Sequence, residues 1–282
     1  MKILAIDSSG LAASAAVVED DLLKCEFTVN NKLTHSETLL PMIREMLALS
    51  GQTLQEIHAV AVAAGPGSFT GLRIGAATAK GQALALDCPM ISVSSLEAMA
   101  YSVSLMSDAC LCPVMDARRG QVYAAAYRHG ACVIPEAAVG LGLFLEQLSA
   151  LPDTEDTEFI FLGDGVPVHA EAITAGLDRD VSFAGPAHNR QRGAAVAELG
   201  ACLYQKWLGR NGLTAELVKE IGADQIKCFD DIVMNSDSFV PHYLRQTQAE
   251  RELAEGLLED AGLHSLKKLR EHAGSRNGHA HH

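Results

Sequence analysis

A seven-residue turn rich in glycine constrains the fold of this chain more than any other feature. The turn, Gly65-Pro-Gly-Ser-Phe-Thr-Gly71, joins an apolar run over His58 to Ala64 to a helical pattern over Leu72 to Leu86. A continuous apolar run between helical patterns predicts a central parallel strand that is buried on both faces. Glycines after such a strand let backbone amides approach an anion, so a phosphate at the helix N-terminus is the first interpretation.

Common motifs for nucleotide binding and hydrolysis do not fit this turn. A P-loop ends in Gly-Lys-Ser or Gly-Lys-Thr, whereas Leu72 and Arg73 follow Gly71, and the third glycine falls one residue late for G-x-G-x-x-G. The Gly-x-Ser-x-Gly elbow of serine hydrolases fails because Phe69 and Thr70 separate Ser68 from the next glycine. The sequence also lacks His-Glu-x-x-His, so a protease is not expected.

Composition narrows the class of protein. With 282 residues, 48% hydrophobic and 20% charged, the chain is predicted to form a soluble α/β protein of two lobes. A net charge of -13 argues against a main nucleic-acid-binding surface, since such surfaces need clustered Lys and Arg. Seven cysteines without a C-x-x-C pair predict buried free thiols in a reducing compartment. Because no apolar stretch reaches the roughly 18 residues of a membrane span, we expect a cytoplasmic protein without membrane contact.

Two predicted hairpins resemble each other. The first strand, Lys2 to Ile6, ends at Asp7-Ser8-Ser9-Gly10 and returns over Ala12 to Val18. The second, Pro113 to Asp116, turns through Ala117-Arg118-Arg119-Gly120 and returns over Gln121 to Tyr127. Asp7 and Asp116 occupy matching places, which indicates two lobes built on one plan around a cleft. On these residues alone, chance similarity is an equal alternative.

Two predicted helices of the N-terminal half carry contrasting patterns. The helix Ser36 to Leu49 has an apolar face and ends at Gly51. That face consists of Leu39, Leu40, Ile43, Met46 and Leu47. The helix Leu72 to Leu86 is instead rich in small residues, including Gly75 and Gly81, which indicates a close neighbour. That neighbour is a helix of the same lobe or one from another chain. His35 is expected to cap or pack rather than to catalyse.

The second half is predicted to alternate helices and strands. We expect a strand at Phe159 to Leu162 and helices at Pro135 to Ala150, Val166 to Gly176 and Gly193 to Leu208. Residues Ala249 to Ala273 are predicted to form an extra helix or a tail. His279, His281 and His282 are interpreted as a terminal segment or a cloning remnant rather than a metal site.

Six blocks of sequence, in order, carry a family resemblance. They are Met-Lys-Ile-Leu-Ala-Ile-Asp-Ser at the start, His35-Ser-Glu-x-Leu-Leu-Pro41, Gly65-Pro-Gly-Ser-Phe-Thr-Gly-Leu-Arg-Ile-Gly75, Pro89-x-Ile-x-Val-Ser-Ser-Leu96, Asp116-Ala-Arg-x-Gly-x-Val-Tyr123 and Pro241-x-Tyr-Leu-Arg245. With these blocks the chain resembles the TsaB (YeaZ) family. The resemblance implies a two-lobed actin-like, sugar-kinase-like and Hsp70-like ATPase fold (ASKHA), in which each lobe is a mixed sheet with flanking helices. It assigns 1–108 to an N-terminal lobe, 109–245 to a C-terminal lobe with an insertion near 211–238, and 246–282 to a tail, helical or disordered.

The resemblance also implies a function. The paralogue TsaD transfers a threonylcarbamoyl group to the N6 atom of adenosine 37 in tRNA, and there two histidines at i and i+4 on a helix bind a metal. Ser95 and Met99 match those positions in this chain, and neither can replace an imidazole. The chain is therefore interpreted as a non-catalytic subunit, without catalytic or metal-binding residues, that binds TsaD together with TsaE and contacts tRNA only through the complex.

Two surfaces follow from the resemblance. The helices after His35 and Gly65 are expected to pair with those of TsaD, or of a second copy in a homodimer, although some of their side chains must pack inside their own lobe. The interface candidates are Leu39, Ile43, Met46, Leu47, Arg73, Ile74, Ala77 and Thr78.

The resemblance also implies a vestigial nucleotide cleft, with weak binding of ATP or ADP alone or in the complex. Its candidate residues are Asp7, Ser8, Ser9 and Asp116. No cofactor is expected to be required. The alternative function is an independent ATP-dependent phosphotransferase or ATPase that uses Asp7 or Asp116.

Overall fold

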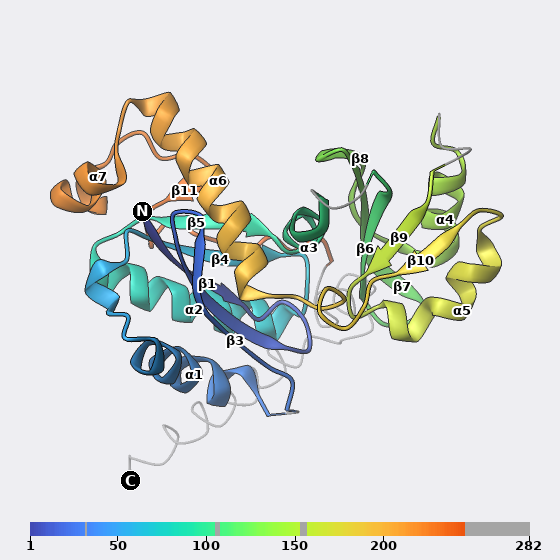
Figure 1. The fold of residues 1–282 in the computed structure, drawn as a ribbon, viewed down its shortest axis with the longest axis horizontal. Coiled ribbons are helices and arrows are strands. Elements are labelled where there is room, and N and C mark those ends of the chain that lie inside the picture. Colours follow the sequence, from blue (N-terminus) through green and yellow to red (C-terminus); the bar gives the residue numbers. More distant parts are fainter. Residues whose placement is uncertain (32, 105–107, 153–156, 246–282) are drawn as a thin grey trace, which may run out of the picture. The chain divides into compact units, whose positions relative to one another are not determined.

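Two mixed β-sheets form the core of this computed structural model, which describes residues 1–31, 33–104, 108–152 and 157–245 (Figure 1). Within the described residues, the first sheet has the strand order β11-β5-β4-β1-β2-β3 and the second the order β10-β9-β6-β7-β8. The first sheet contains β1 (Lys2–Asp7), β2 (Ala13–Glu19), β3 (Leu22–Val29), β4 (Ala59–Gly65), β5 (Met90–Ser94) and β11 (Val233–Met234). The second contains β6 (Cys110–Asp116), β7 (Gln121–Arg128), β8 (Ala131–Gly140), β9 (Phe159–Leu162) and β10 (Val181–Phe183).

The two sheets repeat one topology. In the first, β1 pairs with β2 in antiparallel and with β4 in parallel orientation, and β4 pairs in parallel with β5. In the second, β6 pairs with β7 in antiparallel and with β9 in parallel orientation, and β9 pairs in parallel with β10. Asp7 ends β1 and Asp116 ends β6, so the two aspartates occupy equivalent places. The predicted repetition of the hairpins is therefore confirmed.

Helices cover both faces of the first sheet. The helices α1 (His35–Ser50) and α2 (Phe69–Leu86) lie on one face, and α6 (Gly193–Asn211) lies on the other (Figure 1). Alternate residues of β1 serve the two faces: Leu4 packs in the cluster with α1 and α2, whereas Ile3 packs in the cluster with α6. Every residue of β4 is buried, as expected for a central parallel strand.

Helices also lie on both faces of the second sheet. The helices α4 (Leu141–Ser149) and α5 (Val166–Gly176) contribute to the cluster on one face. The helix α3 (Ser95–Ser104) follows β5 of the first sheet and packs against β6 and β7 on the other. There Leu96 and Met99 join Leu111 and Met115 in one buried cluster. This helix therefore connects the two sheets by packing as well as by sequence.

Residues 193–244 belong with the first sheet, which moves the predicted lobe boundaries. The helix α6 and the short helix α7 (Ala215–Ile221) pack on that sheet and β11 is its edge strand, whereas the resemblance implied a C-terminal lobe over 109–245. Trp207 is fully buried, and its ring stacks on Phe229 with 5.8 Å between ring centroids. The segment 211–238 thus completes the edge of the first sheet. The predictions for 246–282 lie outside the described residues.

Two further expectations need correction. The predicted helix Pro135 to Ala150 is half strand, because β8 runs to Gly140 before α4 begins. Proline is tolerated there because β8 is an edge strand. All seven cysteines are free, as predicted, but Cys132 and Cys228 are exposed and Cys25 and Cys202 are half-buried, so only the remaining three are buried thiols.

Candidate functional site

The glycines of the turn after β4 accommodate the chain's own backbone. A Cβ on Gly67 would collide with the carbonyl oxygen of Ser9, and a Cβ on Gly71 with that of Ser8. The amide of Ser68 donates a 2.7 Å hydrogen bond to Ser9 O, and Ser8 Oγ donates a 2.9 Å bond to Gly71 O. The space that a phosphate would need is therefore filled by the β1–β2 turn, and the first interpretation of the glycines is wrong.

The start of the same turn contacts the far end of the described chain. The amide of His242 donates a 2.7 Å hydrogen bond to Ala64 O, and a Cβ on Gly65 would collide with His242 O. Tyr243 lies against Phe69, with 4.9 Å between ring centroids, and the guanidinium of Arg73 lies 3.9 Å from the Phe69 ring centroid. Two of the blocks that carry the resemblance therefore pack on each other.

Three of the four candidate nucleotide residues are buried and hydrogen-bonded internally. Asp7 is 1% exposed, and its Oδ1 accepts hydrogen bonds from the Ser9 amide at 2.9 Å and from Ser9 Oγ at 2.7 Å. Burial raises the pKa of Asp7 above its usual range, and the nearby charge of Asp164 raises it further. The raised pKa makes ionisation of this carboxyl less favourable, which weakens it as a metal ligand or as a base for water.

Side chains of the second half close the space beside the first hairpin. Gln191 is fully buried, and its side-chain amide packs so closely on Gly10 that a Cβ there would collide with it. Asp164 is also buried, which raises its pKa. His35, at the start of α1, also contacts the first hairpin, since its Nε2 lies 2.9 Å from Gly10 O. The expected packing role of His35 is thus confirmed, and a nucleotide between the hairpins would have to displace these groups.

The fourth candidate, Asp116, has an exposed side chain at the second turn, while its backbone contacts the buried carboxyl of Asp164. Its Oδ1 accepts a 2.8 Å hydrogen bond from the Arg118 amide and lies 3.8 Å from His169 Nε2. Arg118 and Arg119 have φ values of 62° and 56°, a left-handed conformation that is uncommon outside glycine. The equivalent aspartates therefore have different environments, one buried and one solvated.

Ser95 and Met99, the positions matched to the metal histidines of the paralogue, are both buried in α3. Met99 packs with residues of the second sheet, so its position faces protein rather than solvent. In the described parts of the chain, no group of three His, Cys, Asp or Glu side chains is placed to bind a metal ion. No helix among the described residues is long and apolar enough to cross a membrane.

Half of the predicted interface residues are not accessible. Leu39, Ile43, Met46 and Leu47 are all buried in the core between α1 and the first sheet, so they cannot present side chains to a partner. The apolar pattern identified the correct face of the helix, but that face packs inward. Leu40 belongs to the same predicted face and is 54% exposed, which makes it the leucine of this set that points outward.

The α2 half of the predicted interface is better placed. Arg73 and Ala77 are exposed, whereas Ile74 and Thr78 are half-buried and Ile74 packs against its own core. Gly81 and Leu84, which were not among the candidates, continue the exposed row of Arg73 and Ala77 at helical spacing. Of the two helical glycines, Gly75 faces Ser8, whereas a Cβ at Gly81 would meet no described atom within 4 Å beyond the adjoining backbone of its own helix.

The repeated order of strands, with the hairpin and two parallel neighbours in each sheet, defines a two-lobed α/β protein of the actin-like class. A family model described as "TsaD: tRNA N6-adenosine threonylcarbamoyltransferase" matches residues 30–253. The chain is 34% identical over 204 residues to the tRNA threonylcarbamoyladenosine biosynthesis protein TsaB of Bacillus subtilis, covering 71% of this chain and 87% of that relative. The chain belongs to the TsaB (YeaZ) family.

Two further comparisons concern a second relative and the fold. TsaB of Escherichia coli is 41% identical over 129 residues, which span 45% of this chain and 55% of that relative. The solved structure of YeaZ from Pseudomonas aeruginosa has a TM-score of 0.65 at 23% identity, and the match covers 86% of this chain and 99% of that one. The structural likeness confirms the predicted fold.

Proposed function

We propose that this chain is a non-catalytic subunit of the machinery that synthesises N6-threonylcarbamoyladenosine in tRNA, and that it binds a TsaD-type transferase together with TsaE. The relatives named TsaB support the pathway. The buried Ser95 and Met99 support the absence of a transferase metal site in this chain. Since tRNA modification occurs where tRNA is made and used, we place the protein in the cytoplasm.

The observation that carries the proposed partner surface is the outward row of α2. Ala77 and Gly81 are small and exposed, so a partner helix can approach the backbone of α2 closely there. Leu84 and, on the neighbouring α1, Leu40 are 67% and 54% exposed and supply apolar surface that a partner would bury. We assign the same row to self-association, so that TsaD and a second copy compete for it.

Reconstitution tests the proposal. Threonylcarbamoyl transfer to a substrate tRNA is measured with purified TsaD, TsaE and a source of threonylcarbamoyl-adenylate, with and without this chain. We expect transfer to require the chain and the chain alone to give none. Equal transfer without the chain would contradict the proposal.

A charge placed in the row tests the surface itself. Gly81→Glu has space for its side chain and replaces a poor helix former, so the fold should persist. We expect it to weaken both TsaD binding and self-association by about tenfold or more, because a carboxylate must then be desolvated at the contact. Gly142→Glu is the matched control, since Gly142 is also an exposed helical glycine without a described atom within 4 Å. If Gly81→Glu weakens only one of the two associations, the surfaces are separate.

The alternative, an independent ATPase or phosphotransferase, requires a nucleotide to enter between the hairpins. Ser8, Ser9 and Gln191 already occupy buried positions there. A separate assay of ATP hydrolysis by the chain alone tests this alternative, and turnover that is lost in Asp7→Asn or Asp116→Asn would favour it.

A further inference from the structure

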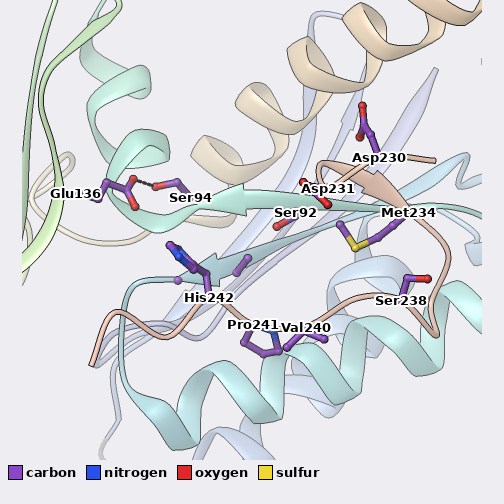
Figure 2. A pocket seen from close by; sticks show the side chains of 12 residues that line it. Ser92, Ser94, Glu136, Asp230, Asp231, Met234, Ser238, Val240, Pro241 and His242 are labelled. Carbon is purple, nitrogen blue, oxygen red and sulfur yellow. Dashed lines mark hydrogen bonds between the residues drawn. The ribbon is translucent and has the colours of Figure 1, made fainter. Parts of the chain in front are cut away.

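A cavity of about 440 Å³ opens at the carboxyl ends of β4 and β5, away from the buried turn of the first hairpin (Figure 2). Gly65 and Ser94 contribute the strand ends, the segment 230–242 covers one side, and Glu136 of β8 closes another. The carboxyl ends of parallel strands are where open α/β sheets bind ligands, and the volume is typical of small-molecule pockets. The residues assigned above to the partner surface on α2 and to the hairpin cleft are not among those that line this cavity.

Glu136 gives the cavity a fixed negative charge. Its Oε1 accepts hydrogen bonds from Ser94 Oγ and, at 3.0 Å, from the hydroxyl of Tyr127. Ser94 Oγ in turn accepts a 3.1 Å hydrogen bond from the Glu97 amide. The contacts recorded for this carboxylate among the described residues are thus neutral hydroxyls, which orient it without balancing its charge. Burial raises the pKa of the neighbouring Glu97, and the charge of Glu136 raises it further.

The remaining walls combine acids with apolar side chains. Asp230 caps the amides of Ile232 and Val233 and pairs with Arg210, so its role is structural. Asp231 is exposed at the rim, and Figure 2 shows it on a different side of the cavity from Glu136. Met234, Val240 and Pro241 supply an apolar surface between the polar groups. Among the residues that the structure describes, neither lysine nor arginine lines the cavity.

We propose that this cavity binds a small organic cation, an aliphatic amine whose ammonium group contacts Glu136 and whose stem lies on Met234, Val240 and Pro241. Carboxylates in a concave, partly desolvated site concentrate cations. A metal ion fits less well, because the described His, Cys, Asp and Glu side chains form no three-ligand cluster. For a diamine, we assign the second ammonium group to Asp231, which lines another side of the cavity.

Calorimetric titration of the full chain with putrescine tests this inference. We expect saturable binding of one putrescine per chain, and no measurable binding of 1,4-butanediol, which has the same length without charge. Glu136→Gln keeps a carbonyl acceptor for Ser94 and Tyr127 and removes the charge, so it should fold normally. We expect it to weaken putrescine binding by about tenfold or more, as charged hydrogen bonds contribute more than neutral ones.

Asp237→Asn is the matched control for non-specific attraction to an acidic protein. Asp237 is exposed in the same covering segment but does not line the cavity. We expect its affinity for putrescine to stay within about twofold of the parent chain, since exposed charges contribute little. Absence of putrescine binding, equal binding of butanediol, or equal weakening in Asp237→Asn and Glu136→Gln would each overturn the proposal.

Discussion

The amide of Ser68 donates a 2.7 Å hydrogen bond to the carbonyl oxygen of Ser9, and this bond joins the turn after β4 to the turn between β1 and β2. The parallel strands β1 and β4 thus end in turns that are hydrogen-bonded to each other. Glycine is required where they touch, because a Cβ on Gly67 or Gly71 would meet backbone rather than a side chain that could move.

Gly71→Ala should destabilise the protein. The new Cβ would collide with Ser8 O, so the β1–β2 turn would have to shift, at a cost of about 1–3 kcal/mol, as is typical of overpacking. Gly81→Ala in the same helix has open space and should instead stabilise by up to about 1 kcal/mol. Urea unfolding followed by the fluorescence of Trp207, the single tryptophan, measures both. Equal stabilities of the two variants would contradict the packing role of Gly71.

The sequence predicted most helices and strands because their periodicity is local. The buried strand before Gly65 and the helices over 36–49 and 166–176 were predicted within a few residues of their observed ends. The edge strand β8 was mistaken for helix, since Ala137, Ala138 and Val139 are half-buried and follow neither period clearly. The glycine-rich turn was wrongly predicted to contact an anion. The backbone that Gly67 contacts instead belongs to Ser9, which lies 58 positions away in the sequence, so no local pattern identifies it.

The candidate site was predicted less well than the fold. An apolar helical face indicates burial but not what buries it, so Ile43 and Leu47 were taken for partner contacts although they pack on their own sheet. The exposed Leu84 could have been found from its helical spacing to Ala77 and Gly81. The cavity beside Glu136 could not have been found, because it joins β4, β5 and β8 with the segment 230–242, which is distant from all three strands in the sequence.

The truncations Met46→Ala and Leu40→Ala, both on α1, should have different effects on stability and on partner association. Met46 is fully buried, so its truncation should cost about 2–5 kcal/mol of unfolding free energy. Leu40 is exposed, so its truncation should change stability by less than about 0.5 kcal/mol while it weakens association with TsaD. Urea unfolding and a binding titration on the same samples give both quantities. A large stability loss in Leu40→Ala would show that this side chain packs inward as well.

Asp7→Asn should stabilise the protein near neutral pH. Burial raises the folded-state pKa of Asp7 above the unfolded value of 3.8, so the folded chain binds this proton more tightly than the unfolded chain. The stability that Asp7 contributes is therefore present at low pH and is lost as pH rises through the raised pKa. An asparagine keeps one carbonyl oxygen for the two hydrogen bonds from Ser9 and avoids the buried charge.

The measurement is the melting temperature of Asp7→Asn and the parent chain from about pH 4 to pH 7. We expect the advantage of the variant to grow with pH across this range, since only the parent must ionise. Asp20→Asn is the control of opposite sign, for which the scan is extended to about pH 2 because the contribution of Asp20 is lost only below the unfolded pKa of 3.8. Asp20 is fully exposed, and its hydrogen bond to the N-terminal ammonium group lowers its pKa, so the stability that it adds is lost as pH falls. If Asp7→Asn is less stable than the parent throughout, Asp7 is ionised in the fold and its burial is compensated by groups other than Ser9.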